Sequence, residues 1–532
     1  MVSLEPQVAG TRRTWIARWL NWIERIGNRL PDPVTLFAVG ALLVLFGSAV
    51  AEALGWQAVN PATNELVKAR SLLSPEGLRW VWLHLVENFT AFPPLGVVLV
   101  AMIGIGVAEH AGLIGALLKS VVVVTPQKLL TPAVVFVGVM SSMAADAGYV
   151  VLPPLAAAVF AQAGRSPIVG LCAVFAGVAS GFSANLFITG LDPLLQSFTQ
   201  QAARILQPDY VVDVRCNYYF MIASTIVMTL TGWAVTHWLV EPRFTPEEVG
   251  EQIRYAESQG VASATGGTGL SREERRGLLA AVLTLLAGSA LIVWMVFSPN
   301  GALSGKVEKR PGVFTDVWVD AIVPILFFLF LLPGIAYGIA AGTIRSDRDV
   351  ARMMNKTMAG MGSYVVMAFF AAQFISWFNE SNLGKLVALE GVELLRQWRL
   401  PVPLLLVAVI LLTTVLNLFI GSASAKWALL STVFVPIFAG MGIRPELTQA
   451  AYRVGDSVTN SIAPLNPYMV IILLYLEKLK PRAGIGTLIA AMLPYAACFL
   501  VVWTLLLLGW VAAGLPLGPG DAAAVAGALP VQ

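Results

Sequence analysis

Long apolar stretches dominate the chain and are separated by short polar connections. A helix needs roughly 20 consecutive apolar residues to cross the hydrocarbon core of a bilayer. The stretches that meet this requirement lie at about 33–54, 95–119, 167–199, 217–240, 277–297, 319–343, 360–379, 446–476 and 484–512. The pattern therefore predicts nine transmembrane helices.

Two further apolar stretches, about 130–163 and 403–440, are each divided by a cluster of small and polar residues. The first cluster is SSMAAD at 141–146, and the second is GSASAKW at 421–427. Irregular backbone is tolerated at membrane depth only inside protein or beside a cavity. We predict that each stretch is a re-entrant hairpin, which enters and leaves the membrane on one side. The alternative is two complete crossings joined by a very short turn.

Gly, Pro and small polar residues also interrupt two of the predicted crossings. The interruptions are GFSANLFITGLDP at 181–193 and GDSVTNSIAPLNP at 455–467. Helices broken at matching places in two halves of a chain are typical of transporter binding sites. A weaker match, EHAGL at 109–113 with NESNL at 379–383, extends the similarity upstream. The identical pairs in the two interruptions are Gly181/Gly455, Ser183/Ser457, Leu191/Leu465 and Pro193/Pro467.

The matches define two copies of one unit, each made of a crossing, a hairpin and a broken crossing, at 95–200 and 360–476. Five crossings separate the starts of the two units, and an odd number implies opposite orientations. Lys and Arg are more frequent in the inner segments when the N-terminus is placed inside, as the positive-inside rule expects. We predict an all-α polytopic membrane protein with inverted repeats and a cytoplasmic N-terminus.

The segments outside the repeats are predicted to have simpler roles. Residues 1–30 carry Arg and Trp at helical spacing, which indicates an amphipathic helix on the membrane surface or a solvated lead-in helix. The others are a first transmembrane helix with an outer loop at 31–94, three linking transmembrane helices at 201–359 with a flexible inner loop at 241–275, and a last transmembrane helix with a tail at 477–532.

Composition agrees with this organisation and excludes several classes of protein. The chain is 57% hydrophobic and 12% charged, which excludes an ordinary soluble domain. A net charge of +3 is too small to indicate a nucleic-acid partner. The three cysteines are scattered, without a disulfide framework or metal spacing. Because no phosphate-binding loop, zinc motif or nucleophile elbow occurs, we expect no enzyme activity and no cofactor.

Ionisable residues at membrane depth are costly and by default indicate a functional site. Glu109, His110 and Glu380 lie near the ends of apolar segments and are interpreted as interfacial, and Asp146 is interpreted as structural. The predicted intramembrane set is Glu109, His110, Asp146, Asp192, Glu380, Lys426, Arg453 and Asp456.

Asp192, Arg453 and Asp456 each have two interpretations. Asp192 follows the first interruption, where its carboxylate either binds Na⁺ or carries a proton, or caps the second half-helix. Arg453 and Asp456 are three residues apart and share a helix face. They either form a salt bridge with each other, or Arg453 binds a substrate carboxylate with its planar fork while Asp456 serves a cation site.

The second hairpin tip adds an aromatic ring and several oxygen ligands. Trp427 is either an interfacial anchor or a ring that stacks on substrate. Oxygens of Asn417, Gly421 and Asn460 suit Na⁺, and Asn185 is the corresponding residue of the first unit. The coupling ion is predicted to be Na⁺ or H⁺.

At these residues the chain resembles the p-aminobenzoyl-glutamate transporter (AbgT) family. The resemblance covers nearly the whole chain and is strongest at GFSANLFITGLDPLL (181–195), NLFIGSASAKWALL (417–430) and YRVGDSVTNSIAPLNPY (452–468). It implies a homodimer in the bacterial inner membrane, with nine crossings and two hairpins in each subunit. It also implies transport of p-aminobenzoyl-glutamate and, in some members, export of sulfonamide antimetabolites.

The resemblance also implies roles for particular residues. Those tied to substrate or function are Asp192, Ser424, Trp427, Pro445, Arg453 and Asp456, and those tied to Na⁺ are Asn417, Gly421 and Asp456. We predict an ion-coupled secondary transporter of p-aminobenzoyl-glutamate or a related aromatic carboxylate, with a small-molecule substrate and membrane lipid as partners. The alternatives are a Na⁺-coupled di- or tricarboxylate transporter and, from another class, an ion channel. An intramembrane hydrolase is disfavoured because no nucleophile motif is present.

Overall fold

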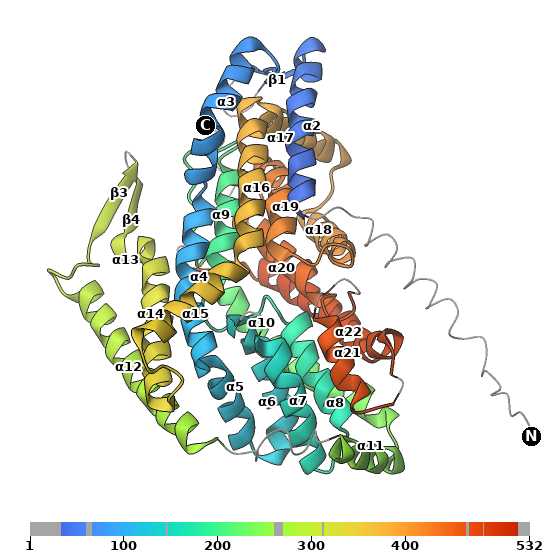
Figure 1. Ribbon diagram of the computed structural model, residues 1–532. Coiled ribbons are helices and arrows are strands. Elements are labelled where there is room, and N and C mark those ends of the chain that lie inside the picture. Colours follow the sequence, from blue (N-terminus) through green and yellow to red (C-terminus); the bar gives the residue numbers. More distant parts are fainter. Residues whose placement is uncertain are drawn as a thin grey trace, which may run out of the picture.

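The protein is described by a computed structural model (Figure 1), which covers most of the chain. The predicted amphipathic helix at 1–30 and Asp146 lie outside the described residues. The described ranges are 33–59, 66–144, 147–259, 270–310, 313–463, 466, 468–481 and 483–519.

Helices dominate the structure, because a chain in lipid must satisfy its backbone hydrogen bonds internally. Up to residue 297 the described α-helices are α2 (Pro33–Ala53), α3 (Pro75–Thr90), α4 (Pro93–Ala111), α5 (Leu113–Val124), α6 (Leu130–Met140), α7 (Ala147–Gln162), α8 (Pro167–Phe175), α9 (Leu191–Ala203), α10 (Tyr218–Val235), α11 (Pro246–Ser258) and α12 (Arg272–Phe297). Shorter 3₁₀ or π segments are η1 (Gln127–Leu129), η2 (Ser141–Ala144), η3 (Ala176–Ser180), η4 (Thr236–Val240) and η5 (Glu241–Arg243).

The remaining described helices follow residue 297, and two small antiparallel hairpins lie in connecting loops. The helices are α13 (Val317–Asp320), α14 (Ile322–Ala341), α15 (Asp347–Gly360), α16 (Gly362–Glu380), α17 (Leu383–Trp398), α18 (Val402–Asn417), α19 (Ala423–Gly440), α20 (Pro445–Val458), α21 (Met469–Glu477) and α22 (Ile485–Ala512). Strands β1 (Gln57–Val59) and β2 (Leu66–Lys68) form one hairpin, and β3 (Lys306–Arg310) and β4 (Val313–Asp316) form the other.

Several helices meet the requirements for crossing a membrane. Among the described residues, six are long and apolar enough, or seven if the bent pair α15 and α16 is counted as one span. On α12, which lies at the edge of the molecule beside α14 (Figure 1), Leu279, Leu286 and Trp294 are more than half exposed, as side chains facing lipid would be. The total of nine crossings and two hairpins stays a prediction.

Both interruptions predicted from the sequence are confirmed over part of their length. Between η3 and α9 the chain is irregular over residues 181–190. In the second unit α20 continues to Val458, and the described residues 459–463 and 466 lie outside a helix. The two broken regions touch, because the backbone N–H of Ser183 donates to Oγ of Ser457 at 3.2 Å. These serines occupy aligned positions, so the contact joins equivalent points of the two units.

The two predicted hairpins are the pairs α6–α7 and α18–α19. Each packs on the broken helix of its own unit, α8 in the first and α20 in the second. The second helix of each hairpin also packs on the second half of the other unit's broken helix, α7 on α21 and α19 on α9. Figure 1 shows the first hairpin in the lower half of the molecule and the second hairpin above it. This reciprocal packing is the arrangement that two inverted copies predict.

The aligned glycines allow each hairpin to approach its broken helix closely. A Cβ atom added at Gly455 would lie 2.4 Å from the backbone oxygen of Ile410 in α18. A Cβ added at Gly181 would lie 2.7 Å from the side chain of Val139 in α6. In both units, therefore, the hairpin packs closely on the backbone of its broken helix.

Replacement of Gly455 by alanine is expected to lower the thermal unfolding midpoint of the purified protein in detergent. Overpacking of a tight helix contact costs about 1–3 kcal/mol. Gly509→Ala in α22 is the control, because a Cβ there meets nothing within 4 Å. Equal midpoints for the two variants would show that α18 can move aside without cost.

The continuous crossing predicted at 95–119 is wrong. Gly112 ends α4 in the left-handed conformation, with φ of 96°, and α5 starts at the next residue. At the aligned position of the second unit, Asn382 has φ of 59° between α16 and α17. Gly and Asn are the residues that adopt this conformation most readily. The weak match of EHAGL with NESNL therefore marks a helix break shared by both units.

The prediction that 241–275 is a flexible linker is also wrong for part of its length. Thr245 and Glu248 form a reciprocal capping box, which begins α11. Ala256 is buried and α11 packs on α8. The Thr-Pro-Glu-Glu sequence at 245–248 carries the signal for a helix start. Residues 260–269 lie outside the described part.

Candidate functional site

A buried ion pair joins the two predicted repeat units. Arg453 of α20 donates from Nη2 to Oδ1 of Asp192 in α9, and both residues are 2% exposed. The other oxygen of Asp192 accepts from the backbone N–H of Thr189 at 2.6 Å and from its hydroxyl at 2.9 Å. Gly190 is the N-cap of α9 and Asp192 is in the first turn, so the predicted N-cap role of Asp192 is wrong.

Two buried donors on one face of α20 lack an acceptor among the described residues. Arg453 directs Nη1 to the sulfur of Met221 at 3.0 Å, a weak acceptor, and its Nε has no partner. One turn earlier, Oε1 of Gln449 accepts from the hydroxyl of Thr199 at 2.6 Å, and Nε2 has no partner. Unpaired buried donors are costly, and they offer a place for an anionic oxygen.

A second buried ion pair joins the second hairpin to α20. Nζ of Lys426 lies 2.6 Å from Oδ1 of Asp456, and it also donates to Oδ1 of Asn417. The hydroxyl of Tyr452 donates to Oδ1 of Asp456 at 2.9 Å. The predicted salt bridge between Arg453 and Asp456 is therefore wrong, because each has a partner on another helix.

Each of the two ion pairs joins one positive and one negative side chain. Asp192 and Asp456 supply two negative charges, and Lys426 and Arg453 supply two positive charges, all at 2% exposure or less. A buried charge is tolerated when it is paired and hydrogen-bonded. The site is consequently neutral as a whole, although it contains four charged groups.

Polar side chains connect each hairpin tip to the broken helix of the same unit. Nδ2 of Asn417 donates to Oγ1 of Thr459 at 3.0 Å and to Oδ1 of Asn460 at 2.8 Å. In the first unit the hydroxyl of Ser142 donates to Oδ1 of Asn185 at 2.7 Å. Asn185 and Thr459 are aligned in the repeat, so the two units use equivalent contacts. Gly421 is exposed at the second tip.

Trp427 lies deep in the protein rather than at a membrane interface, so its interpretation as an interfacial anchor is wrong. It is fully buried, and its indole N–H donates to Oγ1 of Thr199 at 2.9 Å and to the backbone oxygen of Leu195 at 3.2 Å. Its ring stacks on Tyr452, with centroids 4.5 Å apart and planes at 28°. Because Tyr452 also binds Asp456, this stack connects the aromatic residue to the second ion pair.

Trp427→Phe is expected to keep the ring stack and lose the indole donor. A buried hydrogen bond whose acceptors keep other partners contributes about 0.5–1.5 kcal/mol. The thermal unfolding midpoint should fall, whereas Trp82→Phe, at a side chain that is 77% exposed, should leave it unchanged. A midpoint for Trp427→Phe equal to that of the parent protein would mean that the indole hydrogen bond contributes nothing.

The other predicted residues lie around this centre at different distances. Ser424 is half-buried in the first turn of α19, with Oγ 3.3 Å from Oγ of Ser422. Pro445 is the buried first residue of α20, about 12 Å along the helix axis from Arg453. Glu380 forms an ion pair with Arg70 of the outer loop, in keeping with its position at a segment end.

Sequence reasoning missed Glu446, which is buried although it adjoins the start of α20. Its carboxylate accepts from the hydroxyl of Tyr210 at 2.8 Å. Burial and the neighbouring Glu446 raise the pKa of Tyr210, so the phenol stays protonated and acts as a donor. This contact fastens the loop between α9 and α10 to α20. In the sequence, the Pro-Glu pair at the start of a helix is the one feature that points to Glu446.

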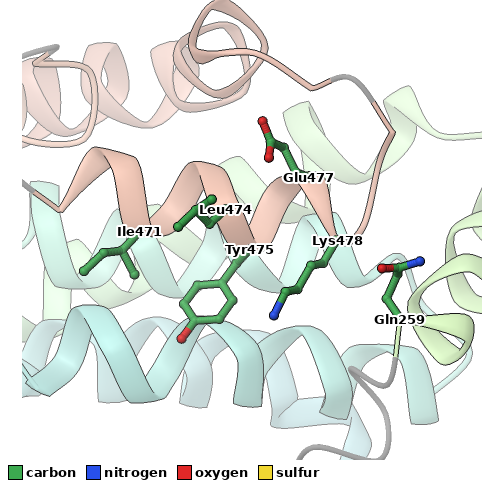
Figure 2. A pocket seen from close by; sticks show the side chains of 6 residues that line it. All are labelled: Gln259, Ile471, Leu474, Tyr475, Glu477 and Lys478. Atoms are coloured by element: carbon green, nitrogen blue, oxygen red, sulfur yellow. The ribbon is translucent and has the colours of Figure 1, made fainter.

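An open cavity of about 460 Å³ lies beside α21 (Figure 2). In Figure 2, Tyr475 and Lys478 both extend toward the neighbouring helix, and the hydroxyl of Tyr475 donates to the backbone oxygen of Val150 in α7 at 3.1 Å. None of the predicted site residues lines this cavity. Its lining is Gln259, Ile471, Leu474, Tyr475, Glu477 and Lys478.

Comparisons with known proteins agree with this architecture. Residues 18–525 match the model of the AbgT putative transporter family. The chain is 36% identical over 499 residues to the p-aminobenzoyl-glutamate transport protein of Escherichia coli (strain K12), covering 94% of this chain and 96% of that protein. The crystal structure of the Alcanivorax borkumensis YdaH transporter has a TM-score of 0.84 at 42% identity, over 92% of this chain and all of that one.

A second solved structure, Neisseria gonorrhoeae MtrF, has a TM-score of 0.86 at 42% identity, over 95% of this chain and all of that one. It is described as illuminating a class of antimetabolite efflux pumps. Match over nearly the whole length, at these identities and with the same fold, shows that this chain belongs to the AbgT putative transporter family.

Proposed function

We propose that the protein is an ion-coupled secondary transporter of p-aminobenzoyl-glutamate or a related aromatic carboxylate. The observation that carries the proposal is the guanidinium of Arg453, which is buried between the units and whose Nε has no partner among the described residues. A planar guanidinium binds a carboxylate through two parallel hydrogen bonds. The amide donor of Gln449, one turn away, also has no partner in the described part of the chain and provides a further contact for an anionic substrate.

In this proposal the substrate carboxylate replaces Asp192 on Arg453. Asp192 belongs to the first unit and Arg453 to the second, so their ion pair holds the units together. An incoming carboxylate that takes the guanidinium releases this connection. Substrate binding is thereby linked to relative movement of the two units, which is how alternating access works in inverted-repeat transporters.

The ion and the assembly are further parts of the proposal. Asn417, Gly421 and Asp456 supply oxygens for Na⁺, with Asn185 and Asn460 in neighbouring positions, and H⁺ is the alternative coupling ion. The family resemblance and the distribution of basic residues support a homodimer in the bacterial inner membrane with a cytoplasmic N-terminus.

The relatives support the choice of substrate. The name of the Escherichia coli protein specifies p-aminobenzoyl-glutamate, and the description of the Neisseria structure specifies antimetabolite efflux. We therefore include export of sulfonamide antimetabolites, which carry the same aminophenyl group, as a second activity. The buried aromatic pair Trp427 and Tyr452 lies beside the ion pairs, where an aromatic substrate would have ring partners.

Reconstitution in proteoliposomes tests the proposal. Uptake and efflux of labelled p-aminobenzoyl-glutamate should saturate and should depend on a Na⁺ or a pH gradient, each imposed separately. Flux that rises without limit and ignores both gradients would indicate a channel. Equal competition by succinate or citrate would favour a di- or tricarboxylate transporter. A sulfonamide added to the vesicle interior tests the second activity.

A further inference from the structure

The ammonium group of Lys426 occupies the place where the proposed Na⁺ ligands converge. Its Nζ lies 2.6 Å from Oδ1 of Asp456 and donates to Oδ1 of Asn417. These are the two side chains that the family resemblance assigns to Na⁺. Lys426 itself is 2% exposed, so its charge is held inside the protein and not in solvent.

The surrounding hydrogen bonds are arranged for this ammonium. The amide nitrogen of Asn417 donates to Thr459 and to Asn460. These two hydrogen bonds orient the amide so that its oxygen faces Nζ. Besides the ammonium, Oδ1 of Asp456 accepts a hydrogen bond from the hydroxyl of Tyr452. The stem of Lys426 adjoins a cavity of only about 10 Å³, whose other lining residues include the apolar Leu36 and Phe37 of α2.

Na⁺ fits this ligand set by chemistry but not together with the ammonium. Carboxylate and amide oxygens are suitable hard ligands. However, a second cation placed against Asp456 would repel Nζ strongly, since a low dielectric increases the interaction between charges. It would also leave the otherwise neutral set of two ion pairs with one positive charge in excess.

We propose that the Lys426 ammonium is a tethered competitor of Na⁺, so that Na⁺ binds between Asn417 and Asp456 only after displacing it. Lys426 thereby sets the affinity and selectivity of the ion site. The inference rests on the ion site of the proposed function. The test of this inference measures ion binding alone. The inference can therefore fail while transport of p-aminobenzoyl-glutamate is established, and transport can fail while the inference holds.

The first test measures equilibrium binding of ²²Na⁺ to the purified full-length protein in detergent, at constant ionic strength with choline as the replacement cation. Lys426→Gln is expected to bind Na⁺ at least tenfold more tightly than the parent protein. Lys480→Gln removes an exposed lysine and is expected to leave the affinity unchanged. Affinity in Lys426→Gln equal to or weaker than that of the parent would overturn the proposal.

The second test replaces the tether by a free ligand. In Lys426→Ala, propylammonium is expected to bind in the vacated space, raise the unfolding midpoint and compete with ²²Na⁺. The same amine should have no effect on the parent protein, whose own ammonium fills the site. Absence of competition in Lys426→Ala would contradict the proposal even if Lys426→Gln failed to fold. Size-exclusion chromatography of each variant confirms that the measured protein is folded.

Discussion

Arg453→Gln is expected to weaken binding of p-aminobenzoyl-glutamate at least 100-fold. Each hydrogen bond to a charged group contributes about 1.5–3 kcal/mol, and about 1.4 kcal/mol corresponds to tenfold in affinity. Loss of a two-point contact with the substrate carboxylate therefore exceeds two decades. Equilibrium binding of labelled substrate to the purified protein measures the effect. Arg254→Gln, at an exposed arginine on α11, is the matched control and should bind normally.

A double variant separates binding from stability. Arg453→Gln alone leaves Asp192 buried without its counter-ion, which costs about 3–5 kcal/mol. Adding Asp192→Asn removes the unpaired charge, so the unfolding midpoint should recover while substrate binding stays lost. If the double variant regained substrate affinity together with stability, Arg453 would be a structural residue and not the carboxylate ligand.

The breaks in the helices were predictable because their composition is incompatible with a continuous helix. Gly181 and Gly455 begin segments that are rich in Gly, Pro and small polar residues, and the structure shows both segments irregular in part. The prediction of an inverted repeat followed from counting crossings between the two copies. Both conclusions depend on local composition and on order along the chain, which a sequence contains directly.

The pairing of charges was not predictable in the same way. Arg453 and Asp456 are close in sequence and share a helix face, so local reasoning pairs them with each other. The actual partners, Asp192 and Lys426, come from other helices and are selected by how the units pack. Charge balance among the four residues is visible in the sequence, but assignment of partners requires the three-dimensional arrangement.

Two features were missed for a different reason. The break at Gly112 produces no long polar interruption, because one residue in the left-handed conformation is sufficient to end a helix. The start of α11 depends on a capping box of two side chains, Thr245 and Glu248, within a polar loop. In both cases a single local conformation decides the structure, and average hydrophobicity gives no sign of it.

Asp456→Asn is expected to remove the Na⁺ dependence of transport and to destabilise the protein. The carboxylate is the only formal negative charge that the structure places against the Lys426 ammonium among the described residues. Its neutralisation leaves a buried ammonium unpaired, at a cost of about 3–5 kcal/mol. Transport as a function of Na⁺ concentration in proteoliposomes, together with the thermal unfolding midpoint, measures both consequences.

The matched controls decide what a loss of Na⁺ dependence means. Asp347→Asn changes an exposed aspartate at the start of α15 and should leave the Na⁺ curve unaltered. Combining Asp456→Asn with Lys426→Gln removes both charges of the pair, so stability should return while the Na⁺ response stays absent. A Na⁺ curve for Asp456→Asn that matches the parent protein would show that this carboxylate is no ion ligand. Asp456 would then serve only to neutralise Lys426, and H⁺ would become the coupling ion to test.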